Sequence, residues 1–70
     1  MSGERERQAK EAKIALRGAA SILLHRAGVS LREAGECADE GEAKEARRLA
    51  ALARDLVVAA LHVLDGTEVG

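Results

Sequence analysis

Two long stretches of the chain carry their apolar residues three and four positions apart, which is the spacing of one buried face of an α-helix. No segment shows the alternation with a period of two that a half-buried strand needs. The chain is therefore predicted to be all-α. The apolar positions are Ala9, Ala12, Leu16, Ala19, Ala20, Leu23 and Ala27 in the first stretch, and Ala46, Leu49, Leu52, Ala53, Leu56, Ala60, Val63 and Leu64 in the second.

Glycines and a capping signal divide this helical pattern into three. Gly28 is suited to end the first helix, because glycine adopts the left-handed conformation found just after helix C-termini. Ser30 and Glu33 have the spacing of a capping box, which predicts a new helix start. Further glycines follow the second and third helices. A single domain, 1–70, is expected, with helices over about 3–27, 31–40 and 42–65 and a frayed tail over 67–70.

The predicted helix lengths favour one arrangement. At 1.5 Å per residue, the first and third helices are each roughly 36 Å long, and the second is only about 15 Å long. So short a helix fits best as a bridge across one end, which lets the two long helices run antiparallel. The Ala-rich start of the first helix then faces the Leu- and Val-rich end of the third, and large side chains interdigitate with small ones. A staggered three-helix arrangement is the alternative.

Each long helix carries a second apolar stripe opposite its predicted buried face. Contiguous apolar stripes indicate an interface, whereas single exposed apolar residues need no explanation. We therefore expect a helical-bundle homo-oligomer, with a C2 dimer as the default because that symmetry is the commonest, and a cyclic ring as a further option. Alternatively, the short helix or the tail covers one stripe within the monomer. The predicted interface residues are Ile14, Gly18, Ser21, Ile22, His25, Ala51, Val58, Leu61 and His62.

The charge balance excludes several classes of partner. Eleven Lys and Arg against twelve Asp and Glu leave a net charge of −1, so the chain lacks the basic footprint of a nucleic-acid-binding protein. The longest nearly uncharged run, 56–64, is too short to span a membrane. The N-terminus is charged, unlike a signal peptide, and the single cysteine, Cys37, indicates a reducing compartment. We expect a cytoplasmic protein whose partner is itself, with no nucleic acid and no membrane.

Few side chains are available for site chemistry. His25 and His62 are weak candidate metal ligands. The alternative to a structural protein is therefore a helical bundle that binds a metal ion or haem through these two histidines. Neither belongs to an HxxxH or HxxE pair, so no metal or cofactor is assigned. Cys37 would need a nearby imidazole and a third, orienting group to act as a nucleophile. A free cysteine more often packs as a small apolar residue, so no catalytic residue and no enzymatic activity are expected.

The Met-Ser-Gly start, the glycine stops, the Ser30 and Glu33 capping box and the bias towards Ala, Leu, Glu and Arg resemble de novo designed helical proteins. The resemblance covers the whole chain. It implies a structural purpose, usually a symmetric assembly, with no natural substrate. Together with the apolar stripes, it predicts a structural, self-assembling helical protein.

Overall fold

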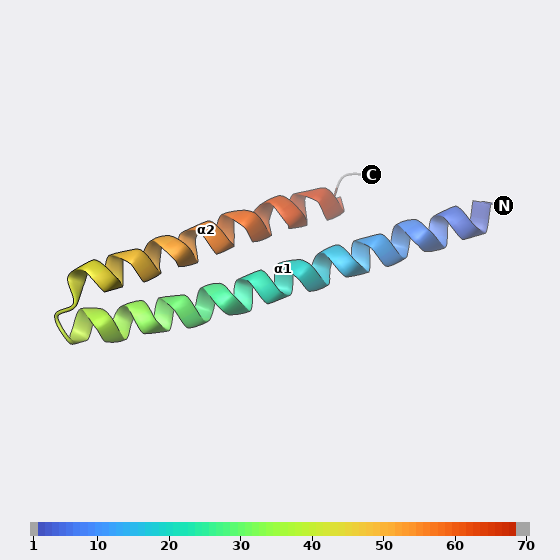
Figure 1. Ribbon diagram of the computed structural model, residues 1–70. Coiled ribbons are helices and arrows are strands. Elements are labelled where there is room, and N and C mark those ends of the chain that lie inside the picture. The colour runs from blue at the N-terminus through green and yellow to red at the C-terminus, as the bar shows by residue number, and fades with distance from the viewer. Residues whose placement is uncertain (1, 69–70) are drawn as a thin grey trace.

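The computed structural model describes residues 2–68, which form two helices joined by a tight turn (Figure 1). α1 spans Ser2–Asp39 and α2 spans Ala43–Glu68. The helices lie side by side and antiparallel, as one long hairpin of 61 × 15 × 11 Å. Because α1 has 38 residues and α2 has 26, the N-terminal part of α1 extends past the end of α2 (Figure 1). We call this part, residues 2–13, the overhang.

The turn is a helix C-cap of the Schellman type. Gly41 has a φ of +81°, the left-handed conformation that glycine adopts without steric cost. The Glu42 N–H donates to the Cys37 carbonyl at 2.8 Å, and the Gly41 N–H donates to the Ala38 carbonyl at 3.1 Å. These two bonds satisfy carbonyls at the end of α1 that have no partner within the helix. The prediction that a helix stops near Gly41 is confirmed.

Alanines that recur every seven residues form the contact between the helices. Ala20 and Ala27 of α1 and Ala53 and Ala60 of α2 are almost completely buried. A repeat of seven keeps one line of each helix facing its neighbour along its whole length. The small side chains allow a close approach, and the half-buried leucines and valine between them fill the remaining space. These residues are Leu23 of α1 and Leu56 and Val63 of α2.

The predicted division into three helices is wrong, because α1 continues through Gly28 and Ser30 without a break. The segment expected to form a bridge, 31–40, is the last part of α1 and its cap. Ser30 is buried at a position of the seven-residue pattern that faces α2, and Ala34 follows at the next such position. An unbroken helix brings these residues against α2, and that packing outweighs the roughly 1 kcal/mol that glycine costs in a helix interior. With no third helix in residues 2–68, the staggered three-helix alternative fails too.

The other end of α2 also differs from the prediction. Gly66 does not end the helix, which continues to Glu68. The Thr67 hydroxyl donates to the Leu64 carbonyl at 2.7 Å, which satisfies a carbonyl in the last turns of the helix. Thr67 and Glu68 are thus helical, and the rest of the tail predicted to fray, residues 69–70, lies outside the described residues.

Candidate functional site

Large apolar side chains cover much of the hairpin's surface. Among residues 3–67, Leu49 is the only buried apolar residue larger than alanine. Where exposed apolar residues are contiguous, they mark interaction sites on soluble proteins. Nine large aliphatic side chains in this range are 37–62% exposed: Ile14, Leu16, Ile22, Leu24, Val29, Leu31, Leu52, Val58 and Leu61.

One side of the hairpin carries two shallow, largely apolar grooves between α1 and α2. Leu24 and Leu64 line a groove of about 410 Å³, and Leu31 and Val57 line one of about 250 Å³. Arg17 and His25 also line the first groove and Arg54 lines the second, but no acidic residue lines either groove. Ser21 lies in the first groove. Leu61 lies on the same side of α2, seven residues after Arg54, which lines the second groove. We call this side the apolar face and define it by Ser21, Leu24, Leu31, Val57, Leu61 and Leu64.

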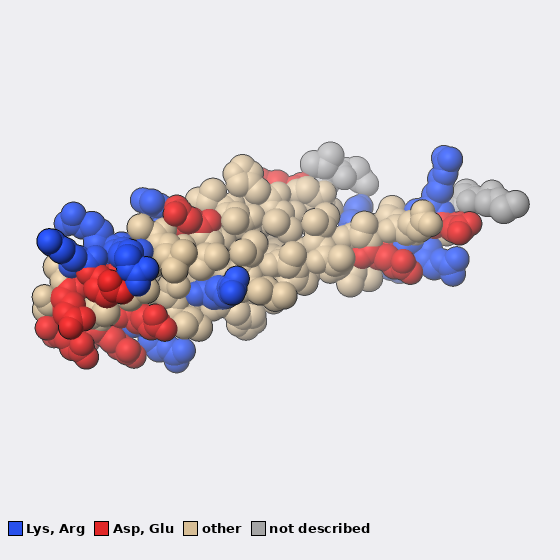
Figure 2. Space-filling view, viewed as in Figure 1, with Lys and Arg blue, Asp and Glu red and all other residues tan. Residues whose placement is uncertain are grey.

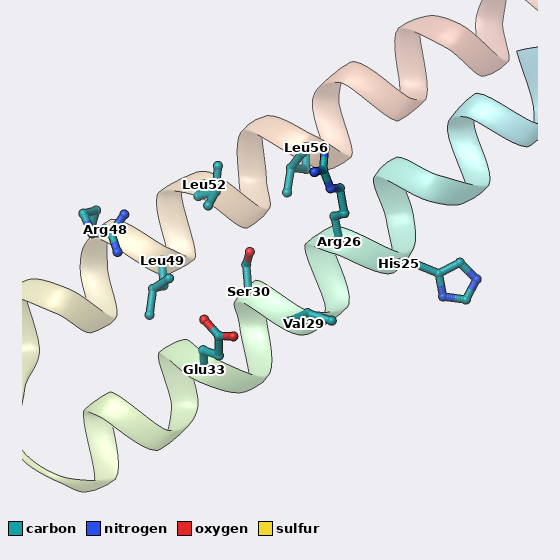
Figure 3. Close-up of a pocket in the computed structure, with 9 residues that line it drawn as sticks. All are labelled: His25, Arg26, Val29, Ser30, Glu33, Arg48, Leu49, Leu52 and Leu56. Carbon is teal, nitrogen blue, oxygen red and sulfur yellow. The ribbon is translucent and has the colours of Figure 1, made fainter.

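The opposite side of the hairpin carries a groove with charged walls (Figure 3). Its volume is about 590 Å³, and Leu49, Leu52 and Leu56 of α2 form its apolar part. Arg26 of α1 reaches across towards α2 in Figure 3. We call this side the charged face. Its charged lining residues are Arg26, Glu33 and Arg48.

An ion pair stabilises the start of α2 beside the charged face. Arg48 donates to the Glu45 carboxylate through two guanidinium nitrogens, one of them Nε at 3.1 Å. This hydrogen bonding lowers the pKa of Glu45 below its ordinary value and raises that of Arg48. Both side chains are exposed, so the pair orders the first turns of α2 and contributes little to overall stability.

The two histidines lie on the outside of the hairpin. Both are exposed, and the His25 ring points away from α2 in Figure 3. His25 lies 16 residues before Gly41 and His62 lies 21 residues after it, so the hairpin does not place them at opposite ends, as the bridged arrangement would. Within residues 2–68, no three His, Cys, Asp or Glu side chains form a group that could hold a metal ion. Metal or haem binding by the two histidines stays a prediction.

Cys37 is half-buried beside the turn. Desolvation by burial raises the pKa of its thiol, and the carboxylates of Glu42, Glu45 and Glu40, with a hydrogen bond to Glu42, raise it further. The thiolate is the nucleophilic form of cysteine, so a raised pKa lowers its reactivity at neutral pH. His25 lies twelve residues away along the helix, or about 18 Å. The surroundings of Cys37 therefore oppose nucleophilic catalysis.

The nine residues predicted to form an interface do not share one face. Ala51 is half-buried and the other eight are exposed. Ser21 and Leu61 belong to the apolar face. Ile14 lies on the same side, seven residues before Ser21. Ile22 lies on the charged side, seven residues before Val29, and His62 lies there fourteen residues after Arg48. Val58 lines the second groove of the apolar face, and His25 lines both the first apolar groove and the charged groove. Gly18 and Ala51 lie on the outer backs of the helices.

The predicted interface leaves out four residues of the apolar face, of which Leu64 is predicted to lie on the buried face. Leu24 and Leu31 lie seven residues apart on α1, and Val57 and Leu64 lie seven apart on α2. All four stand beside the buried line of their helix rather than opposite it. The signal that identifies them is this second seven-residue spacing next to the alanine repeat.

No known protein family, curated protein or solved structure matches the chain. No helix within residues 2–68 has the length and apolar character needed to cross a membrane.

Proposed function

We propose that this chain is a structural, self-assembling helical protein that forms a homo-oligomer through α1 and α2 and has no enzymatic activity. The observation that carries the proposal is the inverted burial of the hairpin, in which alanines form the core and most large aliphatic side chains are exposed. Fully burying one such side chain stabilises a protein by roughly 1.5–3 kcal/mol. A second copy that covers several of them therefore contributes several kcal/mol.

The chemistry of the polar side chains supports a structural role. The raised thiol pKa of Cys37 makes it a poor nucleophile. Neither histidine lies near it along the helices. This role agrees with what the resemblance to designed helical proteins implies. A dimer is the simplest assembly, because two hairpins packed face to face make a four-helix bundle.

Solution mass tests the proposal directly. Light scattering and sedimentation equilibrium across the micromolar range, with chelator present, should give a multiple of the 7.4 kDa chain mass that dissociates on dilution. The chelator ensures that assembly does not depend on metal ligation. A single 7.4 kDa species throughout this range would overturn the proposal.

A further inference from the structure

We propose that the partner on the apolar face is a second copy of this chain, docked antiparallel, with the acidic turn of each copy beside the basic overhang of the other. The inference rests on the proposed function and deepens it, because it names the face, the orientation and the register of the pair. Glycines, side-chain sizes and charges each contribute to it.

The apolar face is large enough for a stable dimer. The paired part of the hairpin comprises the 26 residues of α2, which at 1.5 Å per residue are about 39 Å long. The Cα atoms span 15 Å in the second principal direction. The flat footprint is thus about 600 Å², and the ridged surface of two helices is larger, against roughly 800 Å² per partner in a standard interface. The charged face offers a similar area, but covering it would bury side chains of both charges, Arg26, Glu33 and Arg48, whereas the charged residues that line the grooves of the apolar face are Arg17 and Arg54.

Two glycines point to a closely approaching helix. Gly28 and Gly35 follow Ser21 at intervals of seven residues, on the same side of α1. A Cβ atom at either glycine would meet nothing within 4 Å, and neither has a positive φ, so nothing in the hairpin requires glycine there. Glycine destabilises a helix interior relative to alanine. A helix of a second copy that passes over Ser21, Gly28 and Gly35 can approach α1 closely because these side chains are small or absent, which explains the glycines.

Side-chain sizes define a register for an antiparallel pair of α1 helices. When the two-fold axis passes between Ile22 and Leu23, most of the large side chains on this side lie opposite small ones, as close helix packing requires. When the same axis also passes Ala59 of α2, Val57 lies near Leu61 of the second copy. The point between Ile22 and Leu23 and the point at Ala59 both lie about 18 residues from Gly41 along the chain, so one axis relates both pairs of helices. The α1 pairs are Lys10 with Gly35, Arg17 with Gly28, Leu24 with Ser21, and Leu31 with Ile14.

Charge selects the antiparallel orientation. Residues 36–45, around the turn, carry five acidic side chains and one basic one, whereas the overhang, residues 2–13, carries four basic and three acidic ones. Figure 2 shows charged side chains gathered towards the two ends of the molecule, with a largely uncharged middle. In the proposed register, the turn of one copy lies along the overhang of the other, so a segment with a net charge of −4 meets a segment with a net charge of +1. A parallel pair would place the two acidic turns side by side, where like charges repel.

Disulfide formation between two single-cysteine variants tests the orientation. In a Cys37→Ser background, Arg7→Cys and Ala38→Cys place one thiol in the overhang and one near the turn, at positions that face each other in the proposed register. We expect a disulfide-linked dimer from the mixture and none from either variant alone. Cross-linking of the Ala38→Cys variant with itself would show a parallel pair and overturn the proposal. A mixture that has a dimeric mass in reducing buffer but forms no disulfide under oxidation would also overturn the proposed orientation. A monomeric mass would overturn the proposed function.

A pair of matched charge substitutions tests the face. Leu31 and Leu52 are similarly exposed, at 55% and 43%, but Leu31 lies on the apolar face and Leu52 on the charged face. Leu31→Glu should raise the dimer dissociation constant by about a hundredfold or more, since a carboxylate would be desolvated without a partner. Leu52→Glu should leave it within a factor of about three. Circular dichroism confirms that both variants remain helical, and equal or reversed effects would overturn the assignment of the face.

Discussion

Replacing Gly28 and Gly35 together with alanine should stabilise the single hairpin and weaken the dimer. Neither added Cβ meets an atom within 4 Å in the hairpin, so the substitution adds helix propensity without a clash. The gain is roughly 1 kcal/mol for each glycine in a helix interior, or about 2 kcal/mol for the pair. In the dimer, four added methyl groups would lie between two α1 helices. Overpacking of this kind costs about 1–3 kcal/mol, which corresponds to a dissociation constant about five- to 150-fold higher.

Gly18→Ala is the matched control for this experiment. Gly18 also lies inside α1 with open space around it, but on the outer back of the helix rather than on the apolar face. We expect it to stabilise the hairpin by roughly 1 kcal/mol and to leave the dissociation constant unchanged. Urea unfolding at dilutions where the chain is monomeric measures the first quantity, and sedimentation equilibrium measures the second. A double variant that dimerises as tightly as the Gly18→Ala protein would refute the close approach at the two glycines.

Three further predictions concern the hairpin itself. Ala27→Leu should lower the free energy of unfolding by about 1–3 kcal/mol in urea titrations, because it forces the close-packed helices apart, whereas Ala12→Leu on the exposed overhang should change it by less than about 0.5 kcal/mol. Cys37 should react slowly with iodoacetamide at neutral pH and faster as the pH approaches its raised thiol pKa; a rate as high as that of the urea-unfolded chain would contradict this. The pKa of Glu45 is lowered by Arg48, so the small stabilisation from this pair should be present above the ordinary value of 4.5 and disappear as the pH falls through the folded-state value. Unfolding of Glu45→Gln and the parent should therefore differ at pH 7 and converge in acid, and a constant difference would exclude the carboxylate as the cause.

The all-helical class and the stop at Gly41 could be predicted from the sequence, because both depend on local properties. Helix formers at a helical period predict helices, and a glycine after a helix predicts a left-handed cap. The break at Gly28 failed as a prediction because its signals are also local and each is worth only about 1 kcal/mol. Ser30 and Ala34 instead continue the line that contacts α2. The alanine repeat of seven was visible in the sequence and gives the better prediction of one continuous helix.

The interface predicted from the sequence differs from the apolar face proposed above. The sequence prediction places the partner opposite the buried face of each long helix, with the short helix as a bridge across one end of the pair. In the hairpin, each helix covers only one line of its neighbour. The sides that carry Leu31 and Leu52 are therefore both open. Residues beside the core, such as Leu24, then become better interface candidates than residues opposite it, such as Gly18.

The unequal length of the two helices is explained by the proposed assembly, because the overhang packs against a second copy. Most of the overhang extends past the end of α2 (Figure 1), and an isolated helix of this length is marginal in water. Continuity with the rest of α1 removes the cost of nucleation, but it adds no packing. In the antiparallel register, the second copy's turn lies along this segment. The extra length of α1, its basic side chains and the acidic turn then have one physical explanation, in which each copy supplies the contact that the other's overhang lacks.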